Sequence, residues 1–73
     1  MGQIDELRQW IVRRWPVNAE FSLRDVYRFE DEFSRVYPRN TAIQATFRNL
    51  LQKLRDEGTI RFVDDRGRYQ RVK

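Results

Sequence analysis

Two prolines and one glycine divide this chain into four segments, and this division limits the elements that it can form. Pro16 and Pro38 each end a run with helical spacing, because proline lacks the amide hydrogen and disfavours helix in the residue before it. Gly58 follows a third helical run, at the position where a left-handed residue closes a helix. The sequence therefore predicts three helices, with a non-helical segment after Gly58.

The first helix is predicted over about Gln3–Trp15. Its apolar stripe has spacings of three, four and four residues, and consists of Ile4, Leu7, Ile11 and Trp15. Trp10 lies away from the centre of this stripe. Its ring is expected either at the edge of the core or against another domain.

A single second helix is predicted from Ser22 to Tyr37. Ser22 and Asp25 have the spacing of a capping box, and Pro38 ends the helix. Its predicted apolar face consists of Val26, Phe29, Phe33, Val36 and Tyr37. A short extended piece around Phe21 is expected between the first two helices.

The third helix is predicted to follow the tight turn 38–40. Asn40 or Thr41 caps it, and Thr41 is favoured because Gln44 completes a capping box. The buried stripe of this helix consists of Ile43, Phe47, Leu50, Leu51 and Leu54. Placing that stripe inward leaves a polar outer face with Thr41, Ala45, Arg48, Asn49 and Gln52, and places Gln44 and Arg55 on one flank.

The last segment has the pattern of a β-hairpin. Two short runs, 59–63 and 68–72, flank the turn residues 64–67. Ile60 and Phe62 share the face expected to pack on the helices, and Tyr69 is the expected core residue of the last strand. Alternation would send Arg71 to the same side as Tyr69, so the register stays open.

This order of elements predicts an α+β fold, a winged helix-turn-helix with three helices, a short strand after the first helix and a C-terminal two-stranded wing. Residues 1–73 form one domain, because a chain this short has apolar side chains for a single core. In this architecture the third helix enters the DNA major groove and the wing lies along the backbone or the adjacent minor groove.

Charge and composition agree with that function. Residues 1–33 hold five arginines and seven acids, whereas residues 34–73 hold ten Lys and Arg and four acids, and no acid occurs from Ser34 to Arg55. This uneven charge favours a polyanion partner. The absence of histidine and cysteine excludes zinc-finger, disulfide and imidazole chemistry, and no cofactor or metal is predicted.

The residue types on the third helix are those that contact base edges. Arg pairs with guanine, Asn and Gln with adenine, and Ala or a Thr methyl with an apolar methyl. Basic side chains elsewhere are expected at phosphates. These are Arg24, Arg28, Arg35 and Arg39 around the second helix, Lys53 on the third, and Arg66, Arg68 and Arg71 in the wing.

Residues 21–30, 37–40, 48–58 and 67–69 resemble the C-terminal winged-helix domain of DpnI and the Dam-replacing proteins. The resemblance implies binding of duplex DNA with N6-methyladenine in a GATC-like site, as an accessory domain fused to a nuclease. It implies base reading by Arg39, Asn40, Thr41, Gln44, Ala45, Arg48 and Asn49. The chain itself is then no enzyme. No apolar run approaches about 20 residues, so a cytoplasmic, nucleoid-associated location in a prokaryote is expected.

Three alternatives remain at this point. A winged helix can bind DNA without regard to methylation, or serve as a protein-interaction module, for which Trp10 and Val12 are the candidates. An enzyme is disfavoured, because the acid pairs at 31–32, 56–57 and 64–65 have the pattern of exposed surface pairs and no lysine at nuclease-like spacing accompanies them.

Overall fold

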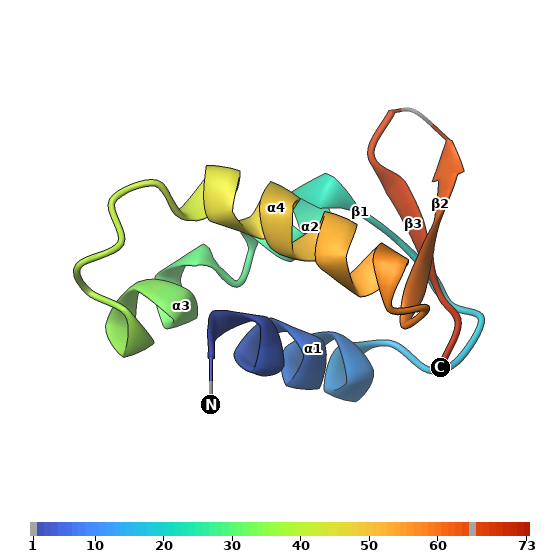
Figure 1. The fold of residues 1–73 in the computed structure, drawn as a ribbon, viewed down its shortest axis with the longest axis horizontal. Coiled ribbons are helices and arrows are strands. Elements are labelled where there is room, and N and C mark those ends of the chain that lie inside the picture. The colour runs from blue at the N-terminus through green and yellow to red at the C-terminus, as the bar shows by residue number, and fades with distance from the viewer. Residues whose placement is uncertain (1, 65) are drawn as a thin grey trace.

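The computed structural model describes residues 2–64 and 66–73, and it confirms the winged helix-turn-helix fold (Figure 1). In these residues the chain forms four helices and three strands: α1 (Gln3–Arg14), β1 (Glu20–Ser22), α2 (Leu23–Tyr27), α3 (Glu30–Val36), α4 (Ile43–Asp56), β2 (Ile60–Asp64) and β3 (Arg68–Arg71). Helix α1 runs beneath α4, and the β2–β3 wing rises beyond the C-terminal end of α4. None of the helices in the described residues is long and apolar enough to cross a membrane.

The three strands form an antiparallel sheet in the order β1-β3-β2. Tyr69 in the central strand lies opposite Phe21 on one side and Phe62 on the other. Its ring centroid is 5.6 Å from that of Phe21 and 5.0 Å from that of Phe62. This register, which the sequence left open, buries Tyr69 and confirms it as the core residue of the last strand.

The core draws on every helix and strand, and α4 supplies the largest share. All five residues of its predicted stripe are buried, and the stripe meets buried side chains from the other elements: Leu7, Ile11, Phe21, Val26, Phe33, Ile60 and Tyr69. Trp10 packs at the edge of this core, with its ring centroid 5.5 Å from that of Phe29 and 6.0 Å from that of Phe33. Of the two positions expected for Trp10, the core edge is therefore the one observed.

The predicted second helix is two helices, which corrects the sequence interpretation. Its start is as expected, since Asp25 N–H donates to Ser22 Oγ (3.2 Å) and Ser22 N–H donates to the Asp25 carboxylate (3.0 Å). At its end, however, Arg28 N–H donates to Asp25 O and Phe29 N–H to Val26 O. These three-residue hydrogen bonds tighten the chain into a 3₁₀-like turn, after which α3 begins in a new direction.

The new direction of α3 changes which side chains reach the core. Phe33 is fully buried, whereas Val36 is 49% exposed, so the prediction that Val36 packs inward was wrong. Tyr37, which was predicted on the same face, does pack against the core, with its ring centroid 4.8 Å from that of Phe33. A continuous helix would have kept Val36 on the apolar face.

The start of α4 also differs from the expectation. The helix begins at Ile43, and the cap position is Ala42 rather than Thr41. Asn40 organises this turn, because its Oδ1 accepts from Ala42 N–H (2.9 Å) and its Nδ2 donates to Thr46 Oγ1 (3.0 Å). One asparagine therefore links the turn to the first turn of the helix, and the predicted Thr41 capping box does not form.

Less of the wing packs against the helices than the alternating pattern predicted. Ile60 is buried, but Phe62 is 36% exposed, because the strands rise away from the body of the domain. Phe62 packs against Tyr69 and beneath Arg55, whose guanidinium carbon lies 4.5 Å from the Phe62 ring centroid. Asp65 of the predicted wing turn lies outside the described residues.

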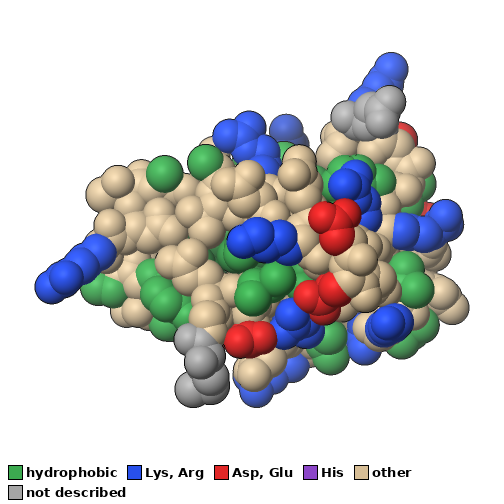
Figure 2. Space-filling model, in the orientation of Figure 1, with side chains coloured by type: hydrophobic (Ala, Val, Ile, Leu, Met, Phe, Trp, Pro, Cys, Tyr) green, Lys and Arg blue, Asp and Glu red, His purple; other side chains and the backbone are tan. Residues whose placement is uncertain are grey.

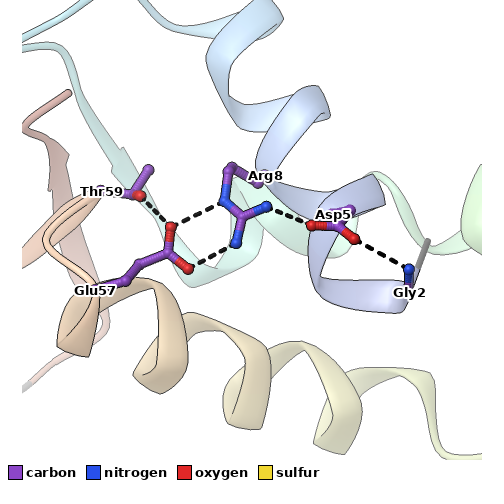
Figure 3. Close-up of polar contacts among 5 residues, drawn as sticks. All are labelled: Gly2, Asp5, Arg8, Glu57 and Thr59. Atoms are coloured by element: carbon purple, nitrogen blue, oxygen red, sulfur yellow. Dashed lines mark hydrogen bonds and ion pairs between the residues drawn. The ribbon is translucent and has the colours of Figure 1, made fainter.

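An ion-pair network ties the end of α4 to α1 (Figure 3). Arg8 donates two hydrogen bonds to the Glu57 carboxylate (2.9 and 2.7 Å) and one to Asp5 (2.6 Å). Thr59 Oγ1 also donates to Glu57 (2.6 Å), and the Gly2 amide donates to Asp5 (3.1 Å). This network accounts for an acid at the C-terminal end of a helix, where the dipole alone disfavours it.

Replacing Glu57 by glutamine is expected to lower stability at neutral pH by about 0.5 to 1 kcal/mol and to have little effect near pH 3. The Arg8 guanidinium, with the Thr59 hydroxyl, holds the pKa of Glu57 below its usual range. A depressed folded-state pKa contributes stability above the ordinary glutamate value, and this stability is lost as pH falls through the folded pKa. Thermal melting across pH measures the effect.

The neighbouring acid provides the control for this prediction. Asp56 is exposed and, within residues 2–64 and 66–73, its side chain is hydrogen-bonded and ion-paired to Arg55 alone, so Asp56→Asn is expected to leave the pH dependence of melting unchanged. Identical melting curves for Glu57→Gln and wild type at every pH would contradict the stabilising role of the network.

Candidate nucleic-acid interface

The exposed face of α4 gathers most of the side chains predicted to contact bases. Gln44, Ala45, Arg48 and Asn49 are all exposed, and they lie on successive turns opposite the buried stripe. Thr41 is exposed just before the helix begins. No acid occurs in α4 until its last residue, so the helix itself places no negative charge against the phosphate backbone before Asp56.

Asn40, which the resemblance placed among the base-reading residues, is already engaged inside the protein. Both ends of its side-chain amide form hydrogen bonds, with Ala42 and with Thr46. It therefore positions the turn before α4 rather than presenting a free amide. Arg39 beside it is exposed and remains available.

Gln44 is held by a residue that the sequence analysis did not single out. Its Nε2 donates to Glu30 Oε1 at the start of α3 (3.3 Å). The sequence carries no signal for this pair, because the two residues come from different helices and their proximity depends on the break between α2 and α3. Asn49, one turn further along α4, has no such contact among the described residues.

The flank of α4 that faces the wing carries two arginines, seven residues apart. Burial, together with the Tyr27 phenol, raises the pKa of Tyr69, and the charge of Arg48 lies close enough to that phenol to oppose the rise. Arg55 packs over Phe62. The sequence analysis did not select Arg55 as a DNA contact, although a seven-residue spacing from Arg48 places both on one side of a helix.

The three wing arginines predicted to contact phosphates differ in their surroundings. Arg66 is exposed at the wing turn, and Arg68 lies 3.6 Å from the Glu20 carboxylate. Arg71 instead donates to the carbonyl oxygens of Val12 (3.2 Å) and Trp15 (2.7 Å) at the end of α1. Arg71 thus donates to carbonyl groups left without a partner at the C-terminal end of α1, and we place it outside the interface.

The remaining predicted phosphate contacts are exposed but dispersed. Arg24 and Arg28 lie at α2, Arg35 on α3 and Lys53 on the flank of α4 opposite Arg48. In the space-filling view, basic side chains appear on all sides, and those at the upper edge, above α4 and at the end of the wing, have few acidic side chains near them, whereas most of the acidic side chains visible lie lower, among other basic ones (Figure 2). The upper edge is therefore the candidate interface.

Comparison with known families agrees with this geometry. The family described as the Dam-replacing HTH domain (DpnI_C) matches residues 6–71, a range that includes most of α1 and every later helix and strand. Helix-turn-helix domains bind DNA through the second helix of the motif, and α4 holds that position here. The chain therefore belongs to the Dam-replacing HTH domain family and is a DNA-binding module.

Proposed function

We propose that this domain recognises N6-methyladenine in a GATC-like duplex site, as the specificity domain of a parent protein that also carries a nuclease. The observation that carries the proposal is the small apolar side chain of Ala45, exposed in the middle of the polar face of α4. A DNA-binding role of this kind would place the parent protein at the nucleoid.

The chemistry of the methylated base suits this face. In duplex DNA the N6-methyl group replaces the groove-facing amino hydrogen, so the adenine edge presents the N7 acceptor and an apolar methyl. The Asn49 amide can donate to N7 while Ala45 and the Thr41 methyl form an apolar wall. Thr46, by contrast, is half-buried and bonded to Asn40, which leaves Thr41 as the better neighbour.

The free energy of burying a methyl group limits how strong this preference for methylated DNA can be. Burying one methyl group contributes about 0.8 kcal/mol, and two in a palindromic site contribute about 1.6 kcal/mol, or roughly 15-fold in affinity. We therefore expect affinity to decrease in roughly equal steps from fully methylated to hemimethylated to unmethylated duplex. A titration against three otherwise identical duplexes at one salt concentration measures this order.

Two acidic substitutions separate methyl recognition from general binding. Ala45→Asp is expected to weaken binding and to abolish the order of the three duplexes. Gln52→Asp places the same charge on the same exposed face, two turns further along α4, and is expected to weaken binding while the order persists. Equal affinity of the wild-type domain for all three duplexes would end the methyl-recognition proposal and leave a methylation-independent DNA-binding domain.

The protein-interaction alternative has less support. Trp10 packs on Phe29 and Phe33, which leaves the exposed Val12 as its remaining candidate contact.

A further inference from the structure

Two surface hollows meet at the base of the wing. One, of about 500 Å³, is lined by Ser22, Leu23, Arg24, Tyr27, Arg66 and Gly67. The other, of about 460 Å³, is lined by Leu23, Phe62, Asp64, Arg66, Gly67 and Tyr69. The two share Leu23, Arg66 and Gly67, so they lie side by side across the wing turn.

The wall between the hollows is held in place by backbone contacts. Leu23 N–H donates to Gly67 O at 2.7 Å, which joins the start of α2 to the wing turn. A Cβ added at Gly67 would lie only 3.2 Å from Leu23 Cβ, and the φ of Gly67 is +83°. Glycine is therefore required at this junction, and the spacing of the two hollows is fixed by the fold.

The two hollows differ in chemistry. The first, which we call the basic hollow, is lined by two arginines, Arg24 from α2 and Arg66 from the wing turn, and by two residues that carry hydroxyls, Ser22 and Tyr27. Among residues 2–64 and 66–73, neither Arg24 nor Arg66 has a carboxylate within 4 Å. Such a set of donors suits an anion with several oxygen acceptors, such as a phosphate.

The second, which we call the aromatic hollow, has the half-exposed ring of Phe62 beside Tyr69 and Leu23. Among the described residues that line it, the one carboxylate is that of Asp64, which accepts from the Arg66 amide (2.8 Å) and would repel a second anion there. The aromatic hollow therefore suits an uncharged, partly apolar group that is attached to the anion.

We propose that the two hollows together hold one deoxyribose-phosphate unit of the bound strand, with the phosphate between Arg24 and Arg66 and the sugar against Phe62. This occupant suits the location, because in this architecture the wing lies along the DNA backbone beside the groove that the recognition helix enters, and both hollows lie at the base of the wing. Tyr27 and Phe62, which the sequence did not indicate as contacts, become binding residues. The inference deepens the proposed function, but it depends on duplex binding and not on methyl recognition.

The salt dependence of duplex binding tests whether the two arginines share one phosphate. Each neutralised phosphate contributes about 0.9 to the slope of log affinity against log salt. We expect the Arg24→Ala/Arg66→Ala double variant to lose about 0.9 from the slope on unmethylated duplex. A loss of about 1.8 would assign the arginines to two separate phosphates, and no loss would remove both from the interface; either result overturns the proposal.

A scan with single methylphosphonates along each strand locates the site. At one position the neutral linkage is expected to weaken duplex binding by the wild-type domain. The same linkage is expected to leave binding by the double variant unaffected, because that variant lacks the two arginines that would contact the phosphate charge. Removing the base from the nucleotide at that position is expected to change little. A loss from the abasic nucleotide as large as the loss from the methylphosphonate would place the base, not the sugar, in the aromatic hollow and overturn the assignment.

Arg13→Ala is the matched control for charge. Arg13 is exposed on α1 and lines a different hollow with Trp10 and Phe29, so its loss lowers net charge without touching the wing. It is expected to leave the slope within about 0.3 of wild type. Because Arg24 and Arg66 contact the backbone, their loss leaves the ratio between methylated and unmethylated duplex unchanged, so this inference and the methyl proposal can fail independently.

Discussion

Replacing Phe47 by alanine is expected to remove most of the stability of this domain, at a cost of about 3 to 5 kcal/mol. Phe47 is fully buried in the middle of α4, and its ring meets that of Phe33 edge to face at a centroid distance of 4.9 Å. Leu51, one turn on and equally buried, is expected to cost about 2 to 5 kcal/mol when replaced by alanine. The whole free energy of unfolding of a domain of this size is about 5 kcal/mol.

Denaturant unfolding followed by circular dichroism measures these costs. Gln52→Ala is the control on the same helix, since Gln52 is exposed, and it is expected to lie within about 0.5 kcal/mol of wild type. Unfolding midpoints near the wild-type value in both core variants would show that the inner face of α4 contributes far less than its burial implies.

Most of the fold could be predicted because each boundary has a local cause. Pro16 follows the end of α1, Ser22 and Asp25 start α2 with a capping box, and Gly58 has the expected left-handed φ of +87°. The apolar stripe of α4 was correct at all five positions, because helical periodicity alone decides which side chains of a long amphipathic helix face inward.

The features that could not be predicted depend on tertiary contacts. The break at Arg28 and Phe29 contains neither proline nor glycine, and no local signal competes with the helical spacing there. The network of Arg8 with Glu57 joins residues 49 apart in sequence. Arg71 donates to carbonyl groups of Val12 and Trp15, which are 59 and 56 residues away in sequence. A pattern of neighbouring residues contains no information on such pairs.

For the candidate interface, the sequence identified a face more reliably than individual roles. The outward position of Ala45, Arg48 and Asn49 follows from the buried stripe, and all three are exposed. Asn40 was selected through the family resemblance and Arg71 by residue type, and the structure engages both in internal hydrogen bonds. Residue type indicates which groups a side chain can bind, whereas the folded contacts decide whether it is free to bind them.

Duplex affinity is expected to fall roughly 200-fold when salt rises from about 50 to 200 mM. Arg71 is removed from the phosphate contacts, but exposed candidates remain at α2, on the flank of α4 and in the wing: Arg24, Arg28, Lys53, Arg66 and Arg68. Four or five phosphate contacts correspond to a slope of about −4 in log affinity against log salt, since each contact releases condensed counterions from the duplex. Fluorescence anisotropy with a labelled unmethylated duplex measures the slope.

The same titration separates charge from methyl recognition. Arg28→Ala is expected to reduce the slope by about 0.9, because Arg28 is exposed at the C-terminal cap of α2, next in the chain to Tyr27. A wild-type slope shallower than about −2 would contradict the footprint on the upper edge. The methyl contact at Ala45 involves no ion, so the ratio of affinities for methylated and unmethylated duplex should stay constant while both fall. A ratio that decays with salt would mean that the preference comes from electrostatics, and Ala45 would then lose its role.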